Sequence, residues 1–210
     1  HVICEKPLEV TTKRVDAMID ACNKAGVVLA GIFPRRFNPS TQLLKQAVDQ
    51  GRFGAIATAD AYVKWWRTQG YYDSGAWRGT WELDGGGALI NQAIHTIDLL
   101  LHLMGDVASV RAETRLIAHD GIEVEDTAVA MLEFKSGALG VIQGSTACWS
   151  DTGHPAEIHI MGSDGSVIMA DDRFRTWTFQ DETTEDAHIR QTHGTDSVQI
   201  GAGAADPSAI

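Results

Sequence analysis

Residues 85–98 read GGGALINQAIHTID, the stretch that organises the middle of the chain. Three consecutive glycines allow the backbone to approach other groups closely. The apolar residues that follow recur with helical spacing up to a glycine at position 105, which predicts a helix over residues 88–104. Asn91, His95 and Asp98 share one face of that helix, because they lie four and three residues apart. Polar groups on an apolar helix need partners, so this face is expected to border a cavity.

A second informative stretch is Glu5-Lys6-Pro7, which follows a short apolar run at residues 2–4. The run predicts a buried strand that meets a loop. A helix capped near Thr11 and a second apolar strand at residues 27–31 come next. Strand, helix and strand in this order make a βαβ unit with parallel strands and a right-handed crossover. Residues 1–33 are therefore predicted to be the C-terminal remnant of a doubly wound, Rossmann-type dinucleotide-binding domain.

The remainder of the chain begins with mixed patterns and then becomes mostly strand. A helix capped by Ser40, a long strand over 56–66 and a polar, aromatic-rich loop over 67–84 precede the helix described above. Six further strands are predicted, with turns between them: 107–117, 124–134, 138–149, 156–161, 166–170 and 174–180. The predicted fold class is α+β, in which residues 34–180 form a large, mostly antiparallel sheet with helices on one face. Residues 181–210 lack clear periodicity and are predicted to be a loop or a frayed tail.

The composition is that of an ordinary globular protein and excludes several function classes. A formal net charge of −11 and a pI of about 5.0 argue against nucleic acid or an anionic membrane as a partner, since both attract clustered Lys and Arg. No apolar run reaches the ~18 residues that cross a bilayer. Three widely spaced cysteines predict free thiols and a cytoplasmic location. No metal site is predicted, because the spacing fits no tight ligand pattern among His154, His159, His188 and His193.

Two side chains are candidates for proton transfer, and each has a structural alternative. Lys6 follows a predicted parallel strand, where open sheets place ligands, and burial there would make its amine usable in proton transfer; the alternative is a surface lysine in a loop. His95 either faces a cavity or is a buried histidine with a backbone partner. Asp98 fits a structural role better, as an anchor for a backbone group or as the partner of an arginine.

Glu5-Lys6-Pro7 and the Gly-Gly-Gly to His-x-x-Asp segment together resemble the glucose–fructose oxidoreductase / inositol dehydrogenase family (Gfo/Idh/MocA) of nicotinamide-dependent sugar enzymes. The resemblance covers roughly residues 1–180. It implies that Lys6 and His95 are catalytic and handle the proton of the substrate hydroxyl. It also implies that Glu5, Lys6, Pro7 and Arg36 border the bound cofactor, NAD or NADP.

The resemblance further implies that part of the protein lies outside this chain. In the family, Glu-Lys-Pro comes late in the cofactor-binding half, whereas here it begins at residue 5. Most of that half, with its phosphate-cradling loop, is therefore expected to be absent, and the chain alone is expected to be inactive. Residues 198–206, VQIGAGAAD, begin like a dinucleotide fingerprint, but Asp206 replaces the third glycine and too few residues follow for the required helix and strand.

Two positions depart from the pattern that the family usually shows. Asn91 stands where an aspartate is usual, and Ala93 stands where a glycine is usual. Asparagine cannot take up a proton, so Asn91 is expected to hydrogen-bond the substrate and to leave proton transfer to Lys6 and His95.

Two aromatic and basic stretches complete the candidate site. Trp77 and Arg78 match a Trp-Arg pair of the family that approaches the same cleft, so both are expected to bind the substrate, and an arginine there could bind its hydroxyls or a phosphate. Residues 64–67, KWWR, form a second aromatic-basic patch. In an acidic chain, this patch indicates core or sugar-stacking surface rather than a nucleic-acid site.

The resemblance implies part of an enzyme that transfers a hydride between NAD(P) and a hydroxyl of a sugar, polyol or sugar derivative. It also implies a homo-oligomer formed through the antiparallel sheet. Two other functions stay open: a non-catalytic sugar-binding or oligomerisation module, and a catalytically silent relative that binds sugars without turnover, for which Asn91 leaves room. The substrate and the choice between NAD and NADP are not set by these residues.

Overall fold

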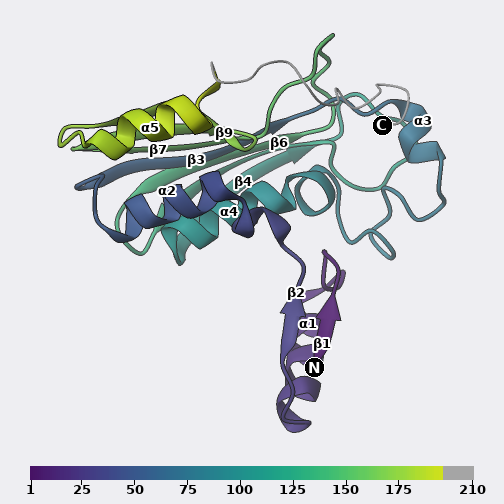
Figure 1. Ribbon diagram of the computed structural model, residues 1–210. Helices are drawn as coiled ribbons and strands as arrows, with labels where there is room; N and C mark the ends of the chain where they lie inside the picture. The colour runs from purple at the N-terminus through teal and green to yellow at the C-terminus, as the bar shows by residue number, and fades with distance from the viewer. Residues whose placement is uncertain (196–210) are drawn as a thin grey trace.

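The computed structural model describes residues 1–195, which form a small N-terminal unit and a larger α+β body (Figure 1). In the N-terminal unit, strand β1 (Val2–Cys4) pairs in parallel with strand β2 (Leu29–Gly31), and helix α1 (Thr12–Lys24) connects them. The Thr11 side chain caps α1 by accepting a hydrogen bond from the Arg14 backbone N–H at 3.3 Å. The predicted strand–helix–strand unit is confirmed. The prediction that its first strand is buried was wrong, because Val2 and Ile3 of β1 are 42% and 74% exposed in the described chain.

A 3-10 helix, η1 (Pro34–Phe37), leads from this unit into helix α2 (Pro39–Asp49). The prediction that Ser40 caps α2 was wrong: the capping position is Asn38, and the proline that follows takes the first helical position, where a missing N–H costs nothing. Ser40 is buried instead, and its hydroxyl donates to the Asp172 carbonyl oxygen at 2.6 Å. This bond ties the start of α2 to the far end of the sheet.

The body is built on a seven-stranded sheet in the order β4-β5-β6-β3-β7-β8-β9. All neighbouring strands are antiparallel except β3 and β6, which run parallel, so the predicted mostly antiparallel sheet is confirmed. The strands are β3 (Ile56–Lys64), β4 (Val107–Arg115), β5 (Thr127–Phe134), β6 (Leu139–Ser145), β7 (Glu157–Gly162), β8 (Gly165–Ala170) and β9 (Arg173–Phe179).

Three helices cover one face of this sheet and close a continuous apolar core. Leu44 of α2, Leu99 of helix α4 (Ile94–Met104) and Ile189 of helix α5 (Thr184–His193) belong to the same buried cluster as the inward side chains of the strands. Along β5 the pattern alternates between buried and exposed residues, as a one-sided sheet requires. Fully burying a side chain of leucine size contributes about 1.5–3 kcal/mol. The α+β class with helices on one face is therefore confirmed.

Helix α5 corrects the prediction that residues 181–210 form a loop or a frayed tail. Thr183 and Asp186 form a capping box, in which each side chain accepts from the backbone of the other residue. The Asp186 carboxylate also pairs with Arg52, at 2.7 Å, and accepts from the Trp177 ring nitrogen. These contacts fix a helix whose own apolar periodicity is weak. Residues 196–210, including the fingerprint-like segment, lie outside the described part.

The structure also corrects the predictions for residues 67–84 and for the end of the strand predicted over 107–117. The predicted loop at residues 67–84 contains a short helix, α3 (Gln69–Asp73), capped by Thr68. Strand β4 ends at Arg115, two residues earlier than predicted. The reason is Asp126, because its carboxylate accepts the backbone N–H groups of residues 117 and 118, at 2.7–3.1 Å, in place of a neighbouring strand.

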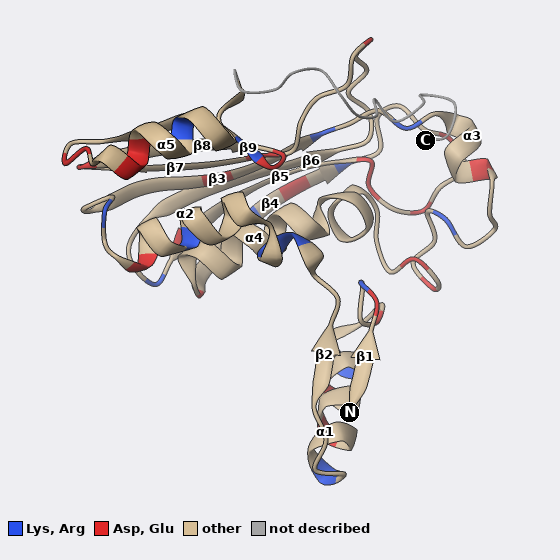
Figure 2. Cartoon of the chain, viewed as in Figure 1, with Lys and Arg blue, Asp and Glu red and all other residues tan. Residues whose placement is uncertain are grey.

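The charged residues of the body are mixed in sign, with Lys and Arg interspersed among Asp and Glu (Figure 2). Within residues 1–195 no helix is long and apolar enough to cross a membrane. All three cysteines are free thiols: Cys4, Cys22 and Cys148.

Candidate functional site

The helix predicted over residues 88–104 begins with a wider turn than an α-helix. Residues Ala88–Ala93 form a π-helix, η2, which continues directly into α4. Glu125 holds its first turn: the carboxylate accepts from the Gly87 and Leu89 N–H groups at 3.1 and 3.0 Å, and the main-chain carbonyl accepts from the Ala88 N–H at 3.0 Å. A Cβ atom on Gly87 would lie 1.7 Å from the Glu125 carbonyl oxygen, so only glycine fits there. Single π-turns of this kind occur often at functional sites.

The π-turn meets the N-terminal unit at Lys6, which lies beyond the carboxyl end of β1. The Lys6 Nζ donates to the main-chain carbonyl oxygen of Asn91 at 3.1 Å. Lys6 is half-buried, so the alternative of a freely solvated surface lysine does not hold. The peptide bond between Lys6 and Pro7 is cis.

His95 lies one turn after Asn91 and is half-buried. Its Nδ1 atom is buried and has no hydrogen-bond partner among the described residues, so the alternative of a core histidine with a backbone partner is not supported at that atom. Burial lowers the pKa of His95, and the nearby positive charges of Lys6 and Arg35 lower it further. The neutral imidazole therefore dominates near pH 7, which is the form that can accept a proton.

The Asn91 side chain is hydrogen-bonded to the carboxylate of Asp84, a residue that the sequence analysis did not predict as part of the site. The Asn91 Nδ2 donates to Asp84 Oδ1 at 2.8 Å, and Asp84 Oδ2 accepts from the Gly79 N–H at 3.0 Å. Asp84 is buried, and this burial raises the pKa of its carboxyl group, while the two hydrogen bonds oppose the rise. Asn91 is thereby held in one orientation at the edge of the pocket.

Lys6, Asn91 and His95 line a pocket of about 700 Å³ together with Arg67 and Arg78. The volume is within the range of small-molecule sites, which is roughly 300–1,000 Å³. The pocket brings together side chains from the N-terminal unit, the π-turn and the segment around α3. Four of the predicted site residues therefore meet in one place although they are far apart in sequence.

The wall formed by the α3 segment consists of arginines stacked on aromatic rings. The Arg78 guanidinium lies 4.1 Å from the Tyr71 ring centroid and 4.4 Å from that of Trp77. The Arg67 guanidinium lies 5.4 Å from the ring centroids of Trp65 and Tyr71. A side chain of the π-turn joins this wall, since Gln92 accepts from Arg67 at 2.9 Å and donates to the Tyr71 hydroxyl at 2.9 Å.

Other predicted site residues lie beside the pocket rather than in its lining. Trp77 is exposed and outside the pocket lining, and its ring contacts the lining residue Arg78. Arg36 forms a two-point ion pair with Asp98, with Nε to Oδ2 at 2.8 Å, and this pair raises the pKa of the guanidinium. The prediction that Asp98 pairs with an arginine is confirmed. Glu5 is exposed at the end of the β1 segment.

Sequence reasoning missed several lining residues, namely Arg67, Tyr71 and Gln92. The KWWR patch contained the one available signal, because two of its residues, Trp65 and Arg67, line the pocket. Nothing in the local pattern of Tyr71 or Gln92 distinguishes them from ordinary surface residues.

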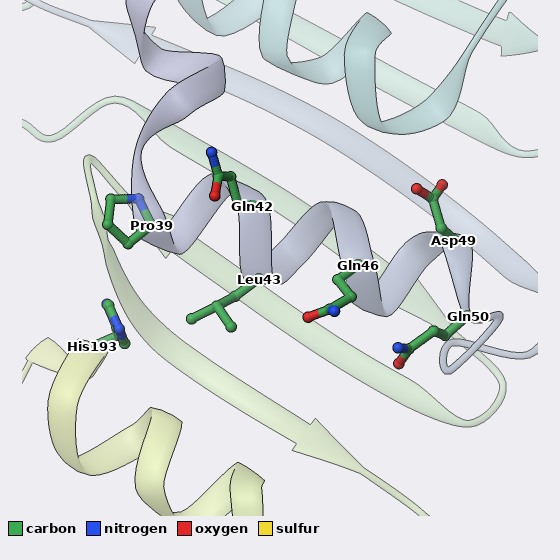
Figure 3. A pocket seen from close by; sticks show the side chains of 7 residues that line it. All are labelled: Pro39, Gln42, Leu43, Gln46, Asp49, Gln50 and His193. Atoms are coloured by element: carbon green, nitrogen blue, oxygen red, sulfur yellow. The ribbon is translucent and has the colours of Figure 1, made fainter.

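A second hollow, of about 580 Å³, lies beside α2, with His193 at the end of α5 on its other side (Figure 3). Most of its lining consists of amide and apolar side chains, among them Gln42, Leu43, Gln46 and Gln50. None of the predicted site residues lies there. Within the described residues, no group of three His, Cys, Asp or Glu side chains could hold a metal ion.

Comparison with known proteins identifies the class that this fold and pocket define. Residues 41–168, more than half of the chain, match the GFO/IDH/MocA C-terminal domain. The chain therefore belongs to the Gfo/Idh/MocA family of oxidoreductases, which confirms the resemblance seen in the sequence.

Particular relatives are sugar and polyol dehydrogenases. The chain is 33% identical over 197 residues to a myo-inositol 2-dehydrogenase of Thermotoga maritima, covering 87% of this chain and 53% of the relative. It is 27% identical over 193 residues to a levoglucosan dehydrogenase of Pseudarthrobacter phenanthrenivorans, covering 80% of this chain and 49% of the relative. The chain thus spans about half the length of the curated relatives it matches.

Solved structures agree with this assignment. The WlbA dehydrogenase from Bordetella pertussis, in complex with NADH and UDP-GlcNAcA, superposes with a TM-score of 0.85 and 41% identity, covering 91% of this chain and 55% of that one. A levoglucosan dehydrogenase in complex with NADH and levoglucosan superposes with a TM-score of 0.78 and 25% identity, covering 88% of this chain and 52% of that one.

Proposed function

We propose that this chain is part of a nicotinamide-dependent oxidoreductase that transfers a hydride between NAD(P) and a hydroxyl of a sugar, polyol or sugar derivative. The observation that carries the proposal is the meeting of Lys6, Asn91 and His95 in one pocket. The names of the relatives, which are inositol and sugar dehydrogenases, support the substrate class. The partial coverage of those relatives supports a chain that works with a further cofactor-binding part.

The chain's own residues suggest how the hydroxyl proton is handled. The neutral imidazole of His95 accepts the proton of the substrate hydroxyl, because burial and neighbouring positive charge favour its uncharged form. The Lys6 ammonium, anchored on the Asn91 carbonyl, stabilises negative charge that develops on that oxygen. Asn91, fixed by Asp84, orients the hydroxyl by hydrogen bonding but cannot accept its proton. NAD(P), when bound, supplies the hydride acceptor.

The residues present fit the nicotinamide end of such a cofactor and not its phosphates. The unpartnered His95 Nδ1 and the Lys6 amine leave hydrogen-bonding capacity where β1 ends. The β1–α1 connection, residues 5–11, contains no glycine, so it cannot cradle a pyrophosphate as a glycine-rich loop does. We therefore expect the 210-residue chain alone not to bind NADH. The test is a titration of the chain with NADH, monitored by tryptophan fluorescence. Saturable binding would contradict the proposal that the phosphates are bound by another part of the protein.

The test is turnover by the whole protein that contains this chain. Lys6→Met and His95→Gln are each expected to lower kcat by about 10²–10⁴-fold, the scale of lost acid–base catalysis. Lys24→Met and His188→Gln are matched controls, because both side chains are exposed and outside the pocket. Near wild-type kcat in both pocket variants would refute the proposed roles.

A second role, assembly through the sheet, is supported by one observation. The outer face of β5 and β6 exposes apolar side chains, namely Val129, Met131 and Leu139. We propose that this face pairs with a second copy of the chain, since exposed apolar patches commonly mark interfaces. Light scattering is expected to show an oligomer that Met131→Glu dissociates; a strict monomer at high concentration would argue against this assembly.

A further inference from the structure

The pocket holds two arginines, Arg67 and Arg78, that form no ion pair among the described residues. Elsewhere, Arg36 pairs with Asp98, and Arg52 pairs with Asp186. Neither Arg67 nor Arg78 has a carboxylate within ion-pair distance among residues 1–195. Both guanidiniums line the same pocket as the Lys6 amine. Three cationic side chains thus converge in a protein whose formal net charge is −11.

The Arg67 guanidinium is partly buried, and it forms no ion pair with a carboxylate of the described residues. Its Nε atom is buried and has no hydrogen-bond partner within the described residues, while its terminal nitrogens donate to the Gln92 side chain and to the Trp66 carbonyl, both uncharged acceptors. Burial lowers the pKa of Arg67, and the positive charge of Arg78 contributes in the same direction. An arginine stays charged even so, and a partly buried guanidinium without an anion is costly to the fold.

One acid, Asp84, interacts electrostatically with Arg78 and Lys6 but forms no ion pair with either. Its two oxygens accept from the Asn91 amide and the Gly79 N–H, and a single negative charge cannot balance three positive ones. Asp84 is also absent from the pocket lining. A neutral sugar would offer only hydroxyl groups to Arg67 and Arg78. A carboxylate or phosphate would supply both acceptor atoms and the missing charge, and the planar guanidinium fits either group with two parallel hydrogen bonds.

We propose that the substrate carries an anionic group, a carboxylate or a phosphate, which Arg67 and Arg78 bind while the reacting hydroxyl lies by Lys6 and His95. The inference deepens the proposed function and rests on it for the identity of the reacting end. The aromatic rings of Trp65, Tyr71 and Trp77 hold the two guanidiniums at this wall before the ligand arrives. Such preorganisation lowers the cost of ordering the side chains on binding.

The experiment measures equilibrium binding to the whole protein, which requires no turnover. D-glucuronate, glucose 6-phosphate and D-glucose serve as probes of a carboxylate, a phosphate and a neutral sugar. At least one anionic probe is expected to bind 10-fold or more tightly than glucose, the scale of one charge-assisted hydrogen bond at about 1.5–3 kcal/mol. The anionic probe that binds more tightly identifies which of the two groups the site prefers.

Arg67→Gln and Arg78→Gln are each expected to weaken binding of the preferred anion about 10-fold or more, and to weaken glucose binding by less than that. Arg115→Gln is the matched control, since it removes one arginine charge that is exposed and outside the pocket lining. Arg67→Lys, which keeps the charge, should retain part of the affinity if the loss in Arg67→Gln is electrostatic rather than a folding defect.

Two results would overturn the inference. One is equal affinity for all three probes in the wild-type protein. The other is an Arg67→Gln or Arg78→Gln variant that weakens NADH and not the sugar anions, because the bound charge would then belong to the cofactor phosphates. Failure of the proposed function looks different: anions bind and the arginine variants lose them, but no sugar is oxidised.

Discussion

Arg52 and Arg78 both lay a guanidinium on an aromatic ring, at 3.9 Å from the centroid of Phe179 and 4.1 Å from that of Tyr71. Beyond the ring, their surroundings differ. Arg52 binds both oxygens of Asp186, at 2.7 and 2.8 Å, and the Asp186 side chain is only 1% exposed. Arg78 forms no ion pair in the part of the chain that the structure describes, and it lines a pocket.

The presence or absence of an ion pair distinguishes two roles for an arginine. The paired Arg52 stabilises the fold, whereas the unpaired Arg78 is available to bind a ligand. The Arg52–Asp186 pair joins the segment before β3 to the start of α5, so its energy holds two distant segments together. The pocket arginines contribute no such link, and their unmet charge lowers stability until an anion binds. Substitution is therefore expected to cost much stability at the paired arginine and little at the unpaired one.

The largest expected difference is in stability. Asp186→Asn should lower the free energy of unfolding by about 3 kcal/mol, because it leaves Arg52 largely buried without its partner. Arg78→Gln should change the same quantity by less than about 0.5 kcal/mol, as for ordinary surface substitutions. Urea denaturation midpoints at constant slope measure both. Equal losses of unfolding free energy in the two variants would show that the paired and the unpaired arginine contribute alike to stability.

A second contrast concerns the turn that positions the pocket. Gly87→Ala should cost about 1–3 kcal/mol, the usual range for overpacking, because its Cβ would meet a backbone oxygen that cannot move aside easily. Gly70→Ala is the matched control, since its Cβ would lie 3.7 Å from the nearest side-chain atom, an ordinary contact. A normal unfolding midpoint for Gly87→Ala would mean that the π-turn tolerates a different backbone path.

The smallest expected effect is a shift in titration. NMR of the histidine rings should show a His95 pKa below the ordinary value of about 6.5, and Lys6→Met should raise it, because a neighbouring positive charge is removed. His102 is the internal control: burial lowers its pKa too, but the positive charges that act on it are Arg36 and Lys45 and not Lys6. A His95 pKa that Lys6→Met leaves unmoved would contradict the coupling in the pocket.

The same two regions lose stability in different pH windows. The unfolded chain binds a proton at His95 more readily than the folded chain does, so acidification below about pH 6.5 begins to cost stability at the pocket. The pKa of Asp186 is lowered mainly by its hydrogen bond with Arg52, so its contribution persists above about pH 4 and is lost only as the pH falls further.

Local spacing was enough to predict the elements with strong periodicity. The βαβ unit, the long strands and the helix that contains His95 all appear where apolar residues recur at strand or helix spacing. Helix α5 was missed because its core contact is a single isoleucine, although the Thr183–Asp186 capping box was readable. The π-turn was missed because an apolar run does not distinguish a π-helix from an α-helix.

By itself, the sequence determined the family, the general fold and the presence of Lys6, Asn91 and His95, because those follow from motifs and from side-chain spacing along one backbone segment. Only the tertiary structure decided which charges would be neutralised. Arg36 pairs with Asp98 across 62 residues of sequence, whereas Arg67 and Arg78 stack on aromatic rings and form no ion pair among the described residues. Such pairing depends on which distant groups folding brings within a few ångströms of one another, and no local pattern encodes that distance.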